Sequence, residues 1–162
     1  MHRRTFLAAL GATATAPAAL FAASGPYEVT MTTAEWREML TPQEFEVMRE
    51  MGTERAYTSP LDKLYEPGQY HCKGCDQPLY PSRTKFDSGT GWPSFWAPFG
   101  EAVQTKPDRG FLGVRTEVHC DRCGSHLGHI FDDGPDPTGK RHCLNGVSLV
   151  FYPKGGGRPI SG

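Results

Sequence analysis

The sequence has no excess of basic residues, since 17 lysines and arginines stand against 18 aspartates and glutamates. Proteins that bind nucleic acid usually carry a clustered positive face, so this balance argues against a nucleic-acid partner. The body of the chain also lacks a 20-residue apolar run and any repeat. These absences exclude a membrane-spanning helix in the body and a repeat architecture. Cysteine is scarce too, with five residues in 162.

The remaining composition indicates one small soluble domain. Hydrophobic residues make up 38% of the chain and charged residues 22%, which suits a modest globular core. Nineteen glycines and 14 prolines favour many turns and short strands over long helices. We therefore predict a mainly β fold, a small antiparallel β domain preceded by short helices.

The first 24 residues are predicted to be a twin-arginine type of export signal. Arg3-Arg4-Thr5-Phe6-Leu7 precedes an alanine- and leucine-rich run, Leu7 to Ala23, which contains no acidic residue. Ala16-x-Ala18 and Ala22-x-Ser24 both suit cleavage, and an uncleaved anchor is the alternative. Removing residues 1–24 leaves 15 basic and 18 acidic residues, a net charge of about −3. The expected location is periplasmic or secreted.

Two short helices are predicted in residues 30–56. Thr32 and Thr41 each precede a glutamate by three residues, the spacing of a capping box. Proline at the first position of the second helix fits, because its missing N–H has no partner there anyway. Gly52 is expected to end this helix. The apolar residues at helical spacing are Trp36, Met39, Phe45, Val47 and Met48.

The chain from Tyr57 onward is predicted to be β. Phe111 to Val114 and Thr116 to His119 read as parts of one strand, and Val147 to Tyr152 is the clearest strand because it is rich in β-branched and aromatic residues. Residues 25–153 are expected to form the domain. The glycine-rich segment 154–162 is expected to be a flexible tail.

Four of the five cysteines form two C-x2-C pairs, Cys72 with Cys75 and Cys120 with Cys123. Four thiolates suit a tetrahedral Zn²⁺, and with every position filled such a site is structural. Redox-active pairs or two disulfides are the alternatives. Disulfides across such tiny loops would add little stability, so we predict one structural zinc ion.

The fifth cysteine, Cys143, has no partner of this kind. A thiol near histidines is a candidate nucleophile, although free cysteine is also often a core residue. His126 and His129 are candidates for proton transfer and for lowering the pKa of the thiol, and Arg141 adds positive charge. Trp92 lies among glycines and a proline on a predicted loop, where aromatic side chains often line substrate sites.

Together these motifs resemble the methionine sulfoxide reductase B family, from about Trp36 to Pro153. The segments that carry the resemblance are Gly89-x-Gly91-Trp92-Pro93-Ser94-Phe95, His126-Leu127-Gly128-His129-Ile130-Phe131-Asp132-Asp133-Gly134-Pro135 and Arg141-x-Cys143-x-Asn145, with the two C-x2-C pairs. The resemblance implies a peptide-methionine (R)-sulfoxide reductase with a mostly β fold.

The resemblance also implies roles for single residues. Cys143 is the nucleophile and becomes a sulfenic acid. His126 or His129 protonates the departing oxygen, and Asn145 completes the catalytic set. Trp92 packs on the S-methyl group of the substrate. Phe131 and Arg141 are expected to line the substrate site.

One position departs from many members of that family. Where they place a resolving cysteine, this chain has Thr90, which cannot form a disulfide with Cys143. The resemblance therefore implies an enzyme with one redox cysteine, recycled by an external thiol such as a thioredoxin-like reductant. The expected substrates are oxidised proteins or peptides with methionine-R-sulfoxide, and we expect a monomer. The alternative is a zinc-stabilised β module that binds proteins without catalysis.

Overall fold

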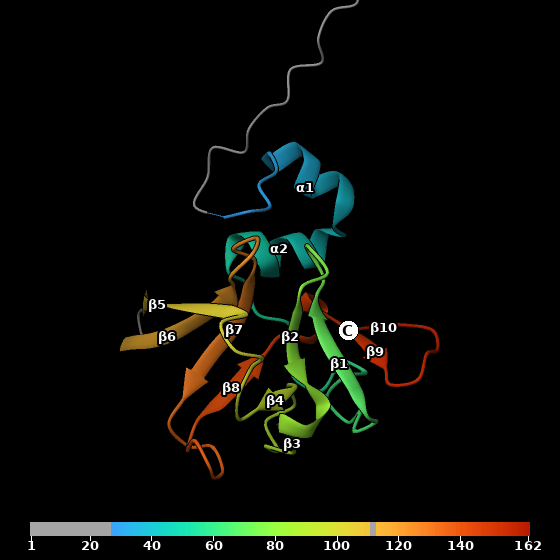
Figure 1. Ribbon diagram of the computed structural model, residues 1–162. Coiled ribbons are helices and arrows are strands. Elements are labelled where there is room, and N and C mark those ends of the chain that lie inside the picture. Colours follow the sequence, from blue (N-terminus) through green and yellow to red (C-terminus); the bar gives the residue numbers. More distant parts are fainter. Residues whose placement is uncertain (1–26, 111–112) are drawn as a thin grey trace, which may run out of the picture.

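The computed structural model describes residues 27–110 and 113–162, and in these residues the chain forms two short helices and two antiparallel sheets (Figure 1). The mainly β fold predicted from the sequence is confirmed. The predicted export signal, residues 1–24, lies outside the described residues. Within them no helix is long and apolar enough to cross a membrane.

The first sheet has the strand order β10-β9-β1-β2, and the second has the order β3-β4-β8-β7-β6-β5. Figure 1 shows both helices at one end of the sheets. The bounds of the elements are α1 Thr33–Met39, α2 Pro42–Glu50, β1 Gly68–Cys72, β2 Pro78–Pro81, β3 Lys85–Phe86, β4 Ser94–Phe95, β5 Val103–Gly110, β6 Gly113–Cys120, β7 His126–Phe131, β8 Arg141–Leu144, β9 Leu149–Pro153 and β10 Ile160–Ser161.

Both helices begin as the capping pattern predicts. The Thr32 hydroxyl accepts the Glu35 backbone N–H, while the Glu35 carboxylate accepts the Thr32 N–H at 2.7 Å. Thr41 and Glu44 repeat this arrangement in α2. The end of α2 differs from the prediction, because the helix stops at Glu50 and Met51 takes the left-handed conformation, with φ of 58°. Of the five apolar residues at helical spacing, Met39 is 44% exposed and the other four are buried.

The strand predicted at Val147 to Tyr152 is β9, and it begins two residues later than predicted. Residues Gly146–Ser148 form a 3₁₀ turn, and β9 begins at Leu149. The segment assigned to a tail ends in a strand, since Ile160 pairs with Phe151 of β9. The predicted strand at 111–119 is β6 from Gly113 onward, while Phe111 and Leu112 lie outside the described residues.

The core lies where the two sheets face each other. Aromatic rings cross the interface, because Tyr70 of β1 packs edge-on against Phe95 of β4 with ring centres 4.9 Å apart. Tyr80 of β2 stacks on the same Phe95 at 4.7 Å, and Phe151 of β9 packs on Tyr70. All four rings are fully buried. This packing holds β4 and its neighbour β8, the strand that carries Cys143, against the first sheet.

Candidate active site

Cys143 lies in the middle of the second sheet, on β8. It pairs with Ser94 of β4 on one side and with His129 of β7 on the other. Directly opposed residues in antiparallel strands point to the same face, with Cβ atoms about 4.5–5.5 Å apart. The sheet register therefore sets a thiol between a hydroxyl and an imidazole.

A cavity of about 130 Å³ opens at Cys143, and we call it the Cys143 cavity. It brings together five of the seven catalytic and substrate-binding residues predicted from the sequence. These five are Trp92, His129, Phe131, Cys143 and Asn145. Thr53, Arg115, Gly128 and Leu144 also line it and were not predicted. His126 and Arg141 lie outside this lining.

Burial dominates the electrostatics of the Cys143 thiol. It raises the pKa of Cys143 above the ordinary 9.0, while the Thr90 hydroxyl, the charge of Arg141 and the Ser94 hydroxyl act to lower it. The Thr90 Oγ1 lies 3.9 Å from the Cys143 Sγ. The sequence led us to expect that the two histidines would lower this pKa. The groups that do so are instead two hydroxyls and a guanidinium.

Arg141 lies behind the wall of the Cys143 cavity. Its guanidinium stacks on the Phe131 ring, with the Cζ atom 4.4 Å from the ring centre. It also donates two hydrogen bonds to the Asp133 carboxylate, at 2.9 and 3.0 Å. This double anchoring fixes both the charge near Cys143 and the aromatic wall.

His129 belongs to a hydrogen-bonded chain with Asp108 and Arg115, which the sequence did not predict. Its Nε2 lies 2.8 Å from the Asp108 carboxylate, which also accepts a hydrogen bond from Arg115 at 2.7 Å. These two bonds lower the pKa of Asp108, so it is ionised at neutral pH. Burial lowers the pKa of His129 below 6.5, although Asp108 opposes this. A neutral imidazole next to a carboxylate carries its proton on Nε2, which leaves the Nδ1 lone pair free to exchange a proton.

His126 is held in a separate buried cluster. Glu117, which is 1% exposed, bridges His119 Nδ1 and His126 Nδ1 at 2.8 Å each. His126 Nε2 is the one buried side-chain polar atom without a partner among the described residues. The rings of His126 and His129 are 5.4 Å apart. The sequence did carry a signal for this cluster, because Glu117 and His119 share one face of a predicted strand.

Replacing Glu117 by glutamine should destabilise the fold in a pH-dependent way. Burial alone would raise the pKa of Glu117, but the hydrogen bonds from His119 and His126 lower it from 4.5 to about 2. That difference corresponds to about 3 kcal/mol of folding stability. Because the folded pKa is depressed, this contribution is present above pH 4.5 and is lost as the pH falls towards 2.

The measurement is chemical denaturation of both proteins at several pH values. At pH 7 the free energy of unfolding of Glu117→Gln should be lower than that of the parent, and this difference should become smaller near pH 3. A difference that stays constant with pH would show that the loss of packing, and not of charge, is responsible.

A buried segment of the chain holds both sides of the Cys143 cavity together. The Glu54 carbonyl accepts the Trp92 indole N–H at 3.2 Å, and its carboxylate accepts the backbone N–H groups of Gly146 and Val147. The Glu54 N–H in turn donates to the Asn145 side-chain oxygen at 3.0 Å, and the Asn145 amide donates to the Leu127 carbonyl. Asn145 thus ties three segments of backbone together at the cavity.

The four remaining cysteines form a compact cluster where β1 and β6 end. Their sulfur atoms all lie within 4.8 Å of one another. Cys72 and Cys123 are 3.6 Å apart, and Cys75 and Cys120 are 3.5 Å apart. A tetrahedron with Zn–S bonds of 2.3 Å has sulfur atoms about 3.8 Å apart, whereas a disulfide needs about 2.05 Å. The arrangement of the cysteines fits one tetrahedral metal ion.

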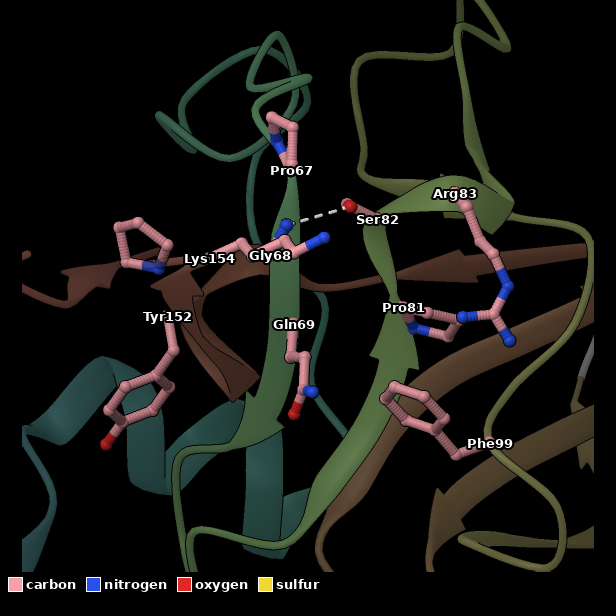
Figure 2. Close-up of a pocket in the computed structure, with 10 residues that line it drawn as sticks. Pro67, Gly68, Gln69, Pro81, Ser82, Arg83, Phe99, Tyr152 and Lys154 are labelled. Atoms are coloured by element: carbon pink, nitrogen blue, oxygen red, sulfur yellow. Dashed lines mark hydrogen bonds between the residues drawn. The ribbon is translucent and has the colours of Figure 1, made fainter. Parts of the chain in front are cut away.

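A second, larger cavity contains none of these reactive residues. Its volume is about 470 Å³, and it lies where β1, β2 and β9 meet. Figure 2 shows Gln69 and Ser82 between Tyr152 on one side and Phe99 and Arg83 on the other. Because this larger cavity offers no thiol, imidazole or carboxylate, the smaller Cys143 cavity is the candidate active site.

Comparison with known proteins identifies relatives over most of the chain. The family model of the SelR domain matches residues 40–153. A peptide methionine sulfoxide reductase MsrB from Methylibium petroleiphilum is 51% identical over 130 residues, which cover 80% of this chain and 94% of the relative. The MsrB of Agrobacterium fabrum is 50% identical, over 78% of this chain and 94% of its own length. Peptide methionine sulfoxide reductase B1, chloroplastic, of Oryza sativa is 52% identical, over 76% of this chain and 58% of its own length.

Proposed function

The chain belongs to the methionine sulfoxide reductase B family, and we propose that it reduces methionine-(R)-sulfoxide in oxidised proteins or peptides to methionine. The observation that carries this proposal is the Cys143 cavity, where a thiol, an imidazole and two aromatic rings face one small space. The reaction class is therefore an oxidoreduction at sulfur, with Cys143 as the nucleophile.

The proposed reaction transfers one oxygen atom between two sulfur atoms. The Cys143 thiol gives up its proton as its sulfur attacks the sulfoxide sulfur, and the sulfoxide oxygen takes up a proton. The oxygen then passes to the sulfur of Cys143, and both the S–O bond of the substrate and the newly formed sulfur–sulfur bond break. The products are methionine and a Cys143 sulfenic acid, so the substrate is reduced by two electrons and the cysteine is oxidised by two.

The size and walls of the Cys143 cavity suit the end of one side chain. A volume of about 130 Å³ is close to the roughly 150 Å³ that holds a benzene-sized apolar guest. Trp92 and Phe131 offer aromatic faces, which make favourable contacts with sulfur and methyl groups. Since the nucleophile and the rings come from different segments, they meet a chiral sulfur from fixed directions and select one epimer.

His129, rather than His126, is proposed to carry the proton. It lines the cavity, and Asp108 holds its proton on Nε2 so that Nδ1 can take the thiol proton and deliver it to the sulfoxide oxygen. The His126 side chain lies outside this lining and donates its Nδ1 proton to Glu117. We propose that His126 supports the position of His129, against which its ring packs.

Replacing each histidine by glutamine separates these roles. We expect His129→Gln to lower the rate of a single turnover by about 10²–10⁴-fold, the usual contribution of a positioned proton carrier. His126→Gln should mainly reduce thermal stability, because it disrupts the buried Glu117 cluster. Rapid-quench measurement of methionine formation tests this, together with thermal unfolding of both variants. The opposite order of rates would assign the proton to His126.

The sulfenic acid is proposed to be reduced by an external thiol. All five cysteines lie in the described residues, and four of them form the metal-type cluster. Thr90, next to Cys143, has no thiol to offer. A thioredoxin-like protein or a small thiol must therefore supply the two electrons.

We propose that the cysteine cluster holds one structural Zn²⁺. Cys72, Cys75, Cys120 and Cys123 would be its ligands, and a zinc ion with four thiolates has no open position for substrate. The ion would act as a cross-link, since it would join the end of β1 in one sheet to the end of β6 in the other.

We further propose that the protein is exported through the twin-arginine route and that it is a monomer. The proposal is supported by the two arginines before an alanine- and leucine-rich run without acidic residues. Detection of the processed enzyme in the periplasm or the medium, and its loss there in an Arg3→Lys, Arg4→Lys variant, would test this. Sedimentation of the purified protein would test the monomer.

The test of the proposed activity is steady-state reduction of peptides with R- or S-sulfoxide, using several thiol donors. We expect turnover of the R epimer and very little of the S epimer. Zinc-containing, folded protein that turns over neither epimer with any donor, and leaves Cys143 as a free thiol, would point instead to a protein-binding module.

A further inference from the structure

A third cavity lies close to Cys143. Its volume is about 390 Å³, and its lining includes Ser88, Thr90, Asp133, Pro135 and Arg141. We call it the Thr90 cavity. It shares no lining residue with the Cys143 cavity. The two are nevertheless adjacent, since the guanidinium of Arg141 in one stacks on the Phe131 ring of the other.

Thr90 stands between this cavity and the reactive sulfur. Its hydroxyl lines the Thr90 cavity and lies 3.9 Å from the Cys143 Sγ. The two glycines beside it, Gly89 and Gly91, have φ of 70° and 87°, which glycine adopts without strain. Cys143 thus lines one cavity, and one small side chain separates its sulfur from a second.

We propose that the Thr90 cavity is the site through which a low-molecular-mass polar thiol reaches and reduces the Cys143 sulfenic acid. This inference rests on the proposed function, because it needs the sulfenic acid to form. It assigns the two half-reactions to two cavities near one sulfur, with the sulfoxide in the Cys143 cavity and the reductant in the Thr90 cavity.

The geometry of displacement at sulfur favours this division. The thiolate of the reductant attacks the Cys143 sulfur, the S–O bond breaks, and the oxygen leaves with a proton as water. The product is a mixed disulfide, and a second thiol attacks the reductant's sulfur to release Cys143 as a thiolate and the reductant as a disulfide. The attacking sulfur approaches opposite to the S–O bond. Because the oxygen is delivered from the Cys143 cavity, the reductant approaches from outside that cavity, where Thr90 faces the sulfur.

The polarity of the Thr90 cavity fits a small polar molecule. The hydroxyls of Ser88, Thr90 and Ser94 form a hydrogen-bonded chain, with distances of 2.8 and 2.7 Å from Ser88. The carboxylate of Asp133 is matched by Arg141 at 2.9 Å. Asp87, also in the lining, is matched by Lys63 at 2.9 Å. The lining is therefore polar with paired charges, and Arg141 favours the thiolate form of the reductant.

The size of the cavity supports the same class of reductant. Sites for small ligands usually measure about 300–1,000 Å³, and the Thr90 cavity lies in that range at about 390 Å³. The Cys143 cavity, at about 130 Å³, is below that range. Two cavities of different size and polarity thus match two different reactants.

Filling the Thr90 cavity tests the proposal. Pro135 is half-buried in its lining and takes no part in the proposed chemistry. Pro135→Trp adds bulk there, while Pro135→Ala removes the proline ring without filling the space and is the matched control. Each protein is first allowed one turnover with R-sulfoxide in the absence of thiol. Reduction of the sulfenic acid by glutathione, or by a thioredoxin, is then followed.

For Pro135→Trp we expect one equivalent of methionine in the single turnover, and a rate constant with glutathione lowered by about tenfold or more, because the reacting atoms are held apart. For Pro135→Ala we expect both steps within about twofold of the parent. Equal glutathione rates in the two variants would overturn the inference. A Pro135→Trp variant that slowed reduction by thioredoxin but not by glutathione would also overturn the inference, since the cavity would then serve a protein.

A second variant protects the test against misfolding of Pro135→Trp. Thr90→Ala removes the side chain between the cavity and the sulfur, so the rate constant with glutathione should rise by about threefold or more. An unchanged or lower rate would contradict the proposal. If the parent enzyme forms no methionine in the single turnover, the proposed function itself fails, and that result is distinct from any change in the thiol step.

Discussion

Cys143→Ser abolishes turnover of methionine-R-sulfoxide, with an expected loss of about 10⁴-fold or more, as for removal of a covalent nucleophile in other enzymes. The reason is chemical, because a serine hydroxyl stays protonated at neutral pH and its oxygen cannot accept the sulfoxide oxygen as sulfur does. The measurement is methionine formation from R-sulfoxide peptides in single-turnover and steady-state assays.

The fold should survive this substitution. Cys143 lies outside the four-cysteine cluster, is partly exposed at its cavity, and differs from serine by one atom. The metal content and the unfolding midpoint of Cys143→Ser should therefore match those of the parent. Full activity in this variant would refute the proposed mechanism, whereas a lower metal content would show that the sulfur also has a structural role.

Cys72→Ser should have the largest effect on stability. Cys72 is 1% exposed at the end of β1, and its sulfur lies 3.6 Å from that of Cys123. Loss of one thiolate opens the tetrahedron, and structural zinc sites contribute apparent binding energies on the order of 10 kcal/mol to folding. We expect loss of the metal and a drop in stability of at least several kcal/mol. Activity should be lost as a consequence of unfolding.

Metal analysis and thermal unfolding check this expectation, and a strong chelator should reproduce the effect in the parent protein. Cys143→Ser is the matched control, since it removes a thiol but leaves the cluster complete. Metal-free protein with two disulfides and unchanged stability would contradict the zinc proposal. If Cys72→Ser stayed folded but lost thiol exchange, the pairs would be redox-active.

The two variants together separate scaffold from chemistry. One removes a sulfur that joins the sheets, and the other removes a sulfur that reacts. The cysteine cluster unites the end of β1 with the end of β6, while β8, with Cys143, lies two strands away from β6 in the second sheet. We therefore expect Cys143→Ser to lose reactivity without losing stability, whereas Cys72→Ser should lose stability first and activity only as a result of unfolding.

Local features of the fold were predictable because their hydrogen bonds join residues close in sequence. Both capping boxes are examples, since Thr32 and Thr41 bond to glutamates three residues ahead. The start of β9 was predicted less well. Val147 looks like a strand residue by propensity, but the Glu54 carboxylate accepts its N–H and holds it in a 3₁₀ turn. No local pattern signals a bond between residues 93 positions apart.

At the candidate site too, local features were predictable from the sequence and contacts between distant residues were not. The sequence by itself determined the membership of the cysteine pairs, the isolation of Cys143 and the presence of Trp92 and His129, because motif spacing and residue type are local properties. Only the tertiary structure decided that His129 meets Asp108 and lines the cavity, while His126 is held by Glu117 outside its lining. It also decided that Cys143 lines one cavity, that Thr90 of a second cavity lies 3.9 Å from its sulfur, and that burial raises its pKa. These properties depend on which strands become neighbours and how much water they exclude, and strand pairing is set by the packing of the whole chain.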